Sequence, residues 1–328
     1  MSSERSLGNI MMFGYPRSGT TWIAEILSAS GELTYLHEPD NERINIHGLY
    51  HKFGGRRFPI APKGRDMVGL FRRSLNGYYL SDQSRLSTYP LAFLKWTPQK
   101  LERYIGSISR SKKLDSRVKL GLLKNLMRTY RALGVAKMQG PFLVKSVHSG
   151  LMLERFIQSP DLDFQPLIVL RHPAAIIRSM KTMKNPDLYR GIEKNPNLSK
   201  LLSEDKIRSI LTLRTPLEKI AMQISIHHHL WHEWAMKYDI KTIKHEDLLV
   251  DPKEGFKTLY QDLGLHFTPR VERLIDQKNK GGAGYKTNRN SKSLIGKWKG
   301  FFSQDELDQI RRGYMILPTP FYSDFSKD

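Results

Sequence analysis

Four short hydrophobic runs along the chain each end at a polar or charged residue. The runs are residues 10–13, 33–36, 142–144 and 167–170. Runs of this length without polar alternation are typical of strands covered on both faces of a parallel sheet, although buried helix segments share the pattern. If all four are parallel strands, the polar residues that follow them share the sheet edge at which ligands bind.

Helical periodicity follows two of these runs. Apolar residues recur at helical spacing in residues 22–30, and residues 172–183 place Pro173 near a first helical turn. A further strand is expected at residues 240–243 and a helix at residues 252–263. The pattern predicts an α/β, P-loop-type fold of three layers, in which a central, mainly parallel sheet is flanked by helices.

Two stretches lie outside this regular pattern. Residues 40–135 are expected to form helical and loop insertions, including an amphipathic basic helix at 114–133, and residues 185–215 contain several prolines. Because loops often carry specificity, both insertions are expected around the acceptor site. The length allows one or two domains, and we expect a single domain over residues 1–328.

The segment after the first run reads YPRSGTTW, residues 15–22. Glycines on both sides of Arg17, Gly14 and Gly19, permit a tight turn that presents backbone N–H groups to an anion at a helix start. In the loop of ATP- and GTP-binding proteins, a lysine follows the second glycine and a hydroxyl serves Mg²⁺. Here Thr20 follows Gly19, and the cation lies inside the loop. We therefore expect a phosphate-type ligand that is bound without that lysine or a metal.

Composition narrows the class of protein. The 328 residues include 53 basic and 32 acidic residues, a formal net charge of +21, and residues 95–137 contain twelve basic residues against two acidic ones. This charge attracts polyanions, but no nucleic-acid-binding module or aromatic interleaving accompanies it. An anionic nucleotide, an anionic glycan, peripheral contact with an acidic membrane, or simply a solvated basic face remain as interpretations.

Cysteine content and hydropathy add further expectations. The chain has no cysteine, which excludes disulfides, thiol nucleophiles and thiolate zinc sites. No apolar run approaches the roughly 20 residues that cross a bilayer, and residues 1–9 lack the apolar segment of a signal peptide. We expect a cytoplasmic, globular protein.

The loop and a second segment together resemble the sulfotransferases that use 3'-phosphoadenosine 5'-phosphosulfate (PAPS). YPRSGTTW is similar to that family's loop for the 5'-phosphosulfate. Arg171-His172-Pro173, with Ser179 eight positions after Arg171, is similar to its site for the 3'-phosphate. The resemblance covers most of the chain in pieces. It assigns donor binding to Arg17, Ser18, Gly19, Thr20, Thr21, Trp22, Arg171 and Ser179.

Two later segments also fit the resemblance. Lys244-His245-Glu246-Asp247-Leu248 with Asp251-Pro252 is similar to a segment of the family that we interpret as structural. Gly296-Lys297-Trp298-Lys299 is similar to a loop that closes over the nucleotide. The resemblance adds candidate contacts to the 3'-phosphate near this loop, and Trp22 could stack on adenine. These candidates are Arg289, Lys292, Gly296 and Lys299.

Transfer of a sulfuryl group needs stabilised charge, an acceptor in line and a base. Arg17 supplies cationic donors, and Lys145, which follows a hydrophobic run, is the second cation by resemblance. A sulfuryl group carries less negative charge than a phosphoryl group, so we expect no metal. The histidines at 227–229 and 232 also lack a typical metal-binding pattern, because only His228 and His232 share a helical face.

Two residues compete for the role of base. Glu38 follows Arg17 by 21 residues and resembles the glutamate of glycan and protein-tyrosine sulfotransferases. Small-molecule sulfotransferases use a histidine in a KTH segment, whereas here His148 stands one residue later, in KSVH. A nearby anionic donor would raise the pKa of Glu38, although Arg17 and Lys145 oppose that effect. We favour Glu38 over His148.

The leading hypothesis is transfer of a sulfuryl group from PAPS to an acceptor hydroxyl. The Glu38 arrangement and the excess positive charge favour a saccharide or glycolipid acceptor, and the alternative is a small alcohol or phenol with His148 as base. A small-molecule P-loop kinase is less favoured because no lysine follows Gly19. The last alternative is a noncatalytic protein that binds polyanions, whose affinity would fall steeply with salt.

Overall fold

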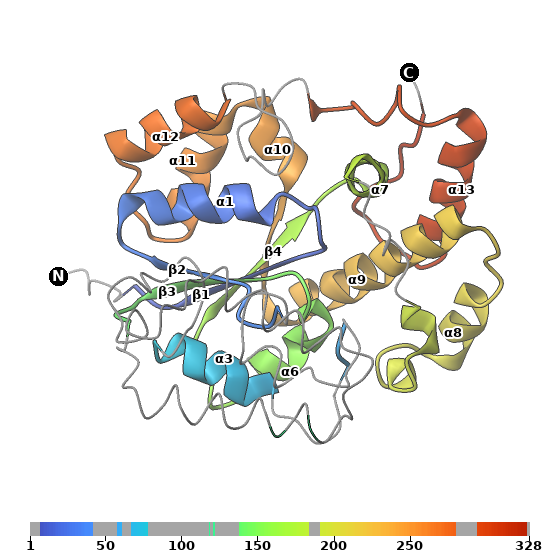
Figure 1. Ribbon diagram of the computed structural model, residues 1–328, viewed down its shortest axis with the longest axis horizontal. Helices are drawn as coiled ribbons and strands as arrows, with labels where there is room; N and C mark the ends of the chain where they lie inside the picture. The colour runs from blue at the N-terminus through green and yellow to red at the C-terminus, as the bar shows by residue number, and fades with distance from the viewer. Residues whose placement is uncertain are drawn as a thin grey trace. The chain divides into compact units, whose positions relative to one another are not determined.

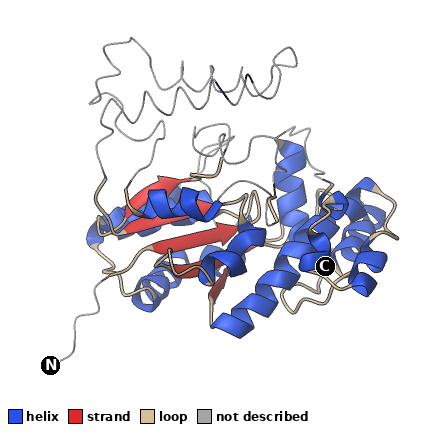
Figure 2. Ribbon diagram, turned by 90° about the horizontal axis from the view of Figure 1, so that it is seen from below, coloured by secondary structure: helices blue, strands red, loops and turns tan. Residues whose placement is uncertain are grey.

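The computed structural model describes residues 7–41, 58–60, 67–77, 118, 121, 138–183, 191–279 and 294–326. Within these residues the strands form one sheet in the order β2-β3-β1-β4-β5, and the β2–β3 and β4–β5 pairs are parallel. The strands are drawn in red in Figure 2. The five strands are β1 (Ile10–Gly14), β2 (Thr34–His37), β3 (Phe142–Ser146), β4 (Gln165–Leu170) and β5 (Lys241–Lys244). Helices flank the sheet, so the predicted α/β fold is confirmed.

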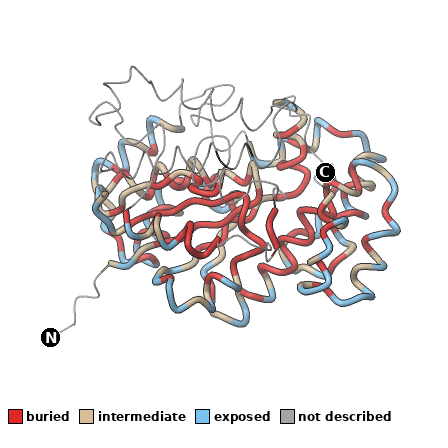
Figure 3. The backbone as a smooth tube through the Cα atoms, turned by 60° about the horizontal axis from the view of Figure 1, so that its bottom comes forward, coloured by how far each residue is buried: buried red, intermediate tan, exposed pale blue. Residues whose placement is uncertain are grey.

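Three of the four hydrophobic runs, residues 10–13, 142–144 and 167–170, lie in strands and are buried along their whole length, whereas in β2 only Leu36 is buried. Every residue of β1 and β3 is buried, and so are the last four residues of β4 (Figure 3). A strand that is covered on both faces cannot alternate polar and apolar side chains without burying polar groups. The edge strand β5 has no buried residue, and lysines stand at both of its ends.

The chain forms two compact units. The first contains residues 1–11 and 33–165, and the second contains residues 12–32 and 166–328. The single domain expected over residues 1–328 stays a prediction.

The first unit is built on the β2–β3 pair. Asn9, just before β1, links the start of β3 to the start of β4: its side-chain oxygen accepts from Phe142 N at 3.0 Å and its carbonyl accepts from Gln165 N at 2.8 Å. The rings of Phe71 and Phe156 pack with their centroids 4.7 Å apart. The helices described in this unit are α3 (Met67–Leu75), the short 3-10 helix η4 (Gly150–Met152) and α6 (Leu153–Ile157).

The second unit contains most of the helices that the structure describes. Its longest described helix is α9 (Pro216–Tyr238). The helices that precede α9 in the chain are α1 (Thr20–Leu27), η1 (Ser28–Ser30), α7 (Pro173–Thr182), η5 (Ile192–Lys194), η6 (Leu198–Lys200) and α8 (Glu204–Ile210). The helices that follow it are α10 (His245–Val250), α11 (Pro252–Asp262), α12 (Pro269–Asn279) and α13 (Gln304–Tyr314) (Figure 1).

Helices α9 and α13 pack closely within this unit (Figure 1). A capping box begins α9, because Glu218 N donates to the Thr215 hydroxyl and the Glu218 carboxylate accepts from Thr215 N. The same carboxylate accepts from Arg312 Nε of α13 at 3.0 Å. A Cβ added to Gly313 would lie 2.2 Å from the Glu218 carbonyl oxygen, so the two helices meet at backbone distance.

The predicted helices agree with the structure apart from their ends. Helix α7 places Pro173 at its start, as expected, after the N-cap residue His172. Helix α1 starts two residues before the predicted segment 22–30, whose last residues form η1. Most of the predicted insertion 40–135 and of its helix 114–133 lies outside the described residues. No described helix is both long and apolar enough to span a membrane.

Candidate active site

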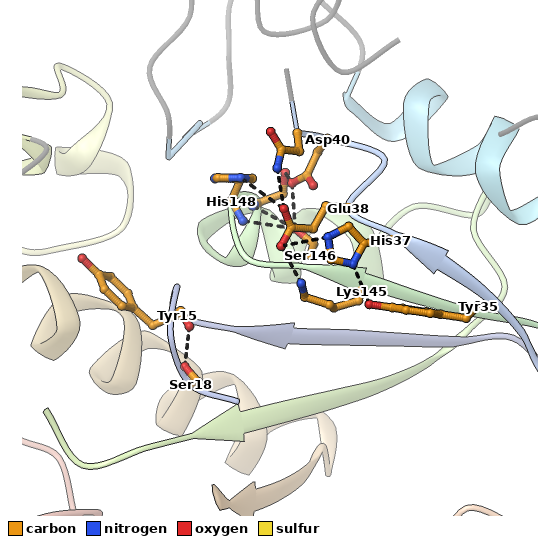
Figure 4. Close-up of polar contacts among 11 residues, drawn as sticks. Tyr15, Ser18, Tyr35, His37, Glu38, Asp40, Lys145, Ser146 and His148 are labelled. Carbon is orange, nitrogen blue, oxygen red and sulfur yellow. Dashed lines mark hydrogen bonds and ion pairs between the residues drawn. The ribbon is translucent and has the colours of Figure 1, made fainter. Parts of the chain in front are cut away.

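The YPRSGTTW loop forms a tight turn between β1 and α1. The Tyr15 carbonyl accepts from Ser18 N at 3.0 Å and also from the Ser18 hydroxyl (Figure 4). Arg17 and Gly19 both have positive φ angles, 77° and 89°. Gly19 is the N-cap of α1, and within the described chain no side chain caps this helix start. The loop therefore presents backbone N–H groups in the manner of an anion-binding nest.

Glycine is required at position 19 for a second reason. A Cβ there would lie 2.2 Å from the His245 ring, which is buried at the start of α10. His245 belongs to the segment that we interpreted as structural, and its ring also packs against Trp22 at a centroid distance of 5.6 Å. Trp22 in turn contacts Phe256. Stacking of Trp22 on adenine stays a prediction.

The two segments expected to bind the ends of the donor are joined directly in the second unit. Arg171 Nη1 donates to the Arg17 carbonyl oxygen at 2.9 Å, and Arg17 Nε donates to the Ser179 hydroxyl at 3.1 Å. Arg171 follows β4 and Ser179 lies on α7, so the strand end and the helix that follows it both reach the loop. The predicted proximity of these three residues agrees with this geometry.

The environment of Arg171 carries an excess of positive charge. Burial lowers the pKa of Arg171, the carboxylate of Glu246 opposes this effect, and the charges of Arg17 and Arg178 lower the pKa further. Both oxygens of Glu246 are engaged elsewhere, with His172 N at 3.0 Å and the Tyr322 hydroxyl at 2.8 Å. Such an environment favours an anion that would balance the guanidinium groups.

The segment Gly296–Lys299 packs beside the Arg171-His172-Pro173 turn. The Trp298 ring stacks on the His172 ring at 4.2 Å with an interplanar angle of 5°. His172 Nε2 and the Asp324 carbonyl lie 2.8 Å apart, and burial lowers the pKa of His172 to about 4. A neutral His172 therefore donates from Nε2 to this carbonyl and ties the C-terminal segment to the turn. Two predicted donor contacts, Arg289 and Lys292, lie outside the described residues.

Glu38 lies in the first unit, beside Lys145 (Figure 4). The β2–β3 register pairs His37 with Lys145, and Glu38 N extends this pairing by donating to the Lys145 carbonyl at 2.9 Å. Lys145 Nζ lies 2.5 Å from Glu38 Oε1, and Asn41 Nδ2 donates to Glu38 Oε2 at 2.5 Å. Both members of the ion pair are buried. Sheet register brings the two backbones together, and Glu38, just past the end of β2, adopts a left-handed conformation with φ 48° as its side chain approaches Lys145.

The surroundings keep Glu38 ionised. Burial raises the pKa of Glu38, but the charges of Lys145, His148 and His37 and the hydrogen bond from Lys145 lower it well below its ordinary value. The two opposing influences leave a carboxylate at neutral pH, which is the form that accepts a proton.

The structure places His148 next to Glu38 despite its displaced position in the sequence. His148 Nε2 lies 3.7 Å from Glu38 Oε2, and the imidazole is buried. The turn that carries it is held by Asp40, whose Oδ2 accepts from the Ser146 hydroxyl at 2.7 Å and from the Ser149 hydroxyl. Sequence analysis did not single out Asp40, Asn41 or Ser146. Their only signal was a run of polar residues after each strand.

The histidine cluster on α9 is part of the packed interior. Each Nδ1 has a partner: the Gln223 carbonyl for His227, the Tyr314 hydroxyl for His228 and the Pro318 carbonyl for His229. Burial lowers the pKa of His227 to about 4 and that of His228 to about 3, so both are neutral at pH 7. Over the described ranges, no group of three or more metal-ligating side chains was found.

Comparisons place the chain in a family. A family model described as the sulfotransferase domain matches residues 7–316. No curated protein matches the chain. The sulfotransferase domain from the curacin biosynthetic pathway is similar, with 16% sequence identity and a TM-score of 0.39 over 96% of this chain and 99% of that one. Mouse sulfotransferase SULT7A1 complexed with PAP has 12% identity and a TM-score of 0.42 over 95% of this chain and 85% of its own. Retinol dehydratase in complex with androsterone and PAP has 17% identity and a TM-score of 0.38 over 93% of this chain and 79% of its own.

The family match spans the loop, the Arg171 turn and the Gly296–Lys299 segment, which are the parts from which the resemblance was inferred. The chain therefore belongs to the sulfotransferase domain family, the PAPS-dependent enzymes that its motifs resemble.

Proposed function

We propose that this enzyme transfers a sulfuryl group from PAPS to a hydroxyl of a saccharide or glycolipid. The observation that carries the donor assignment is the hydrogen bond from Arg171 to the Arg17 carbonyl, because it joins two cationic segments into one site. PAPS is an adenosine with a phosphosulfate at one position and a phosphate at another, so it offers an anion to each segment. The loop would hold the phosphosulfate, and Arg171 with Ser179 would hold the 3'-phosphate.

The residues divide the chemistry among them. The acceptor oxygen forms a bond to sulfur while the bond from sulfur to the phosphate oxygen breaks, which leaves 3'-phosphoadenosine 5'-phosphate (PAP). Arg17 and the loop amides stabilise charge on the departing phosphate, and Lys145 serves as the second cation. Glu38 takes the proton of the acceptor hydroxyl.

The low pKa of Glu38 bears directly on its strength as a base. While Lys145 is bound to it at 2.5 Å, the carboxylate accepts a proton poorly. An anionic donor would raise the pKa of Glu38 by like charge and would offer the Lys145 ammonium a second acceptor. We propose that Glu38 becomes an effective base only when the donor is bound.

Sulfuryl transfer from labelled PAPS to a panel of saccharides, glycolipids and phenols tests the acceptor class. We expect products from the carbohydrate members, in line with the net charge of +21 and the Glu38 arrangement. A chain that sulfates phenols but no carbohydrate would overturn this part of the proposal.

A second candidate function has its own support, namely sulfation of a small alcohol or phenol with His148 as base. The buried imidazole lies only 3.7 Å from Glu38, so either group could receive the proton. Glu38→Gln and His148→Gln should be compared through the pH dependence of kcat. If Glu38 is the base, we expect kcat to fall by at least about 100-fold in Glu38→Gln and by less in His148→Gln. The reverse order favours the second candidate.

Calorimetry distinguishes a sulfotransferase from a kinase and from a noncatalytic polyanion-binding protein. We expect tighter binding of PAP than of ATP, whereas a kinase would prefer ATP. A noncatalytic polyanion-binding protein would bind both weakly, with an affinity that falls steeply with salt and survives Glu38→Ala. Arg17→Ala should nearly abolish turnover, whereas Ser179→Ala should mainly weaken donor binding.

A further inference from the structure

Helix α7 carries an arginine next to Ser179 that has no assigned role. Arg178 is partly buried, and its Nε is a buried donor without a hydrogen-bond partner among the residues that the structure describes. A buried donor left unpaired costs about 1–3 kcal/mol, so such groups are usually satisfied by a ligand or by water. Arg171 Nε, in the same unit, is likewise buried without a partner in the described ranges.

The position of Arg178 is defined by an aromatic ring. Its guanidinium carbon lies 5.5 Å from the centroid of the Phe301 ring, and Phe301 follows the Gly296–Lys299 segment by two residues. A cation–π contact stabilises the guanidinium through its face, while the N–H donors in its plane remain directed elsewhere. This contact therefore restrains the side chain without occupying its hydrogen-bonding groups.

The charges around Arg171 do not balance. Arg17, Arg171 and Arg178 contribute three positive charges, and Glu246 contributes one negative charge. Tyr322 acts on Arg171 as well, but burial raises its pKa well above the ordinary value and leaves it neutral. Among these groups positive charge exceeds negative charge. A phosphate monoester, with about 1.5 to 2 negative charges at pH 7, would offset that excess.

We infer that Arg178 is a further binding residue for the donor, a third guanidinium around the 3'-phosphate beside Arg171 and Ser179. Arg178 gives this site the charge needed for a phosphate dianion, and it makes the enzyme discriminate strongly against adenine nucleotides that lack the 3'-phosphate. The inference rests on the proposed function, which assigns the Arg171 site to that phosphate.

A cycle that changes the protein and the ligand together tests the inference. Calorimetry would measure the affinity of the wild-type enzyme and Arg178→Ala for PAP and for adenosine 5'-phosphate, which differ only in the 3'-phosphate. We expect Arg178→Ala to weaken PAP binding by about 10- to 100-fold, as for loss of one or two charge-assisted hydrogen bonds. Binding of adenosine 5'-phosphate should change less than about twofold.

Matched variants separate binding from general charge and from folding. Arg208→Ala removes an equal charge from the exposed surface of α8, where Arg208 pairs with Glu204 and Asp205, and should leave both affinities unchanged. Arg178→Lys should recover part of the PAP affinity, since a lysine keeps the charge but not the planar donors. Thermal unfolding midpoints of all variants would verify that each is folded.

The outcomes distinguish the two levels of the proposal. If the wild-type enzyme binds PAP no more tightly than adenosine 5'-phosphate, the assignment of the Arg171 site fails and the inference fails with it. If the wild type prefers PAP but Arg178→Ala loses affinity equally for both ligands, or for neither, the donor site stands and the role of Arg178 is refuted.

Discussion

Replacing Lys145 with methionine would leave the Glu38 carboxylate buried without its cation. Lys145 is 2% exposed and Nζ lies 2.5 Å from Glu38 Oε1. At this distance and an effective dielectric constant of about 20, the attraction is about 7 kcal/mol, most of which is offset by the desolvation of both groups. Loss of one partner of such a pair costs about 3–5 kcal/mol. Because Asn41 still donates to Glu38, we expect a loss of about 3 kcal/mol in Lys145→Met.

The loss should depend on pH. In the wild type, the pKa of Glu38 lies well below its unfolded value of about 4.3, so its contribution is fully present above that value and declines below it. Without the ammonium group, burial dominates and the pKa of Glu38 rises above the unfolded value. The variant then regains stability as the pH falls through this raised pKa. The difference between the two proteins should therefore be largest near pH 8 and smaller near pH 5.

Urea unfolding at pH 8 and pH 5 measures this difference as a free energy of unfolding. The double variant Lys145→Met with Glu38→Gln should recover most of the loss at pH 8, since no buried charge remains. Lys181→Met is the matched control, because its pair with Glu306 is one-third exposed on both sides and should be worth less than about 1 kcal/mol. Equal losses at both pH values, without recovery in the double variant, would refute the reasoning.

Two further predictions concern packing and the support of the site. Gly313→Ala should destabilise the fold by about 1–3 kcal/mol in urea unfolding, because its Cβ meets the Glu218 backbone. In Gly255→Ala the added Cβ would mainly contact the Leu248 side chain, 3.1 Å away, so the free energy of unfolding should stay within about 1 kcal/mol of wild type. Equal losses of stability in the two glycine variants would contradict the close packing at Gly313. Asp40→Ala should cost about 2–4 kcal/mol and lower kcat by displacing His148, whereas Asp40→Asn, which keeps an acceptor, should retain more of both. Unchanged kcat in folded Asp40→Ala would argue against a positioning role.

Features that depend on neighbours in the sequence were predictable. The strand, glycine loop and helix at residues 10–27 follow from an apolar run, two glycines and helical spacing, all of which act over a few residues. The proximity of Arg171 and Ser179 follows from a strand end and about two helical turns. The pairing of Glu38 with Lys145 was also accessible in outline, because parallel strands end at a common edge.

Other features arise from contacts between distant segments, and the sequence contains no local signal for them. The position of His148 looked wrong by one residue, yet the Asp40 hydrogen bonds shape a turn that brings the imidazole to Glu38. Residues 172 and 298 stack although 126 positions separate them. Arg178 appeared to be an ordinary helix residue until its buried Nε and its contact with Phe301 were known.

Glycines, arginines and their spacing act through local backbone geometry, so the chain's own residues indicated an anion-binding loop, and the resemblance to a family added sulfuryl transfer. Tertiary structure decided the ionisation and the partners of those groups. The state of Glu38 is the balance of burial and three nearby cationic or titratable side chains, and the charge around Arg171 depends on Arg17, Arg178 and Glu246. Burial and charge proximity are properties of the packed chain, because they depend on which distant segments meet.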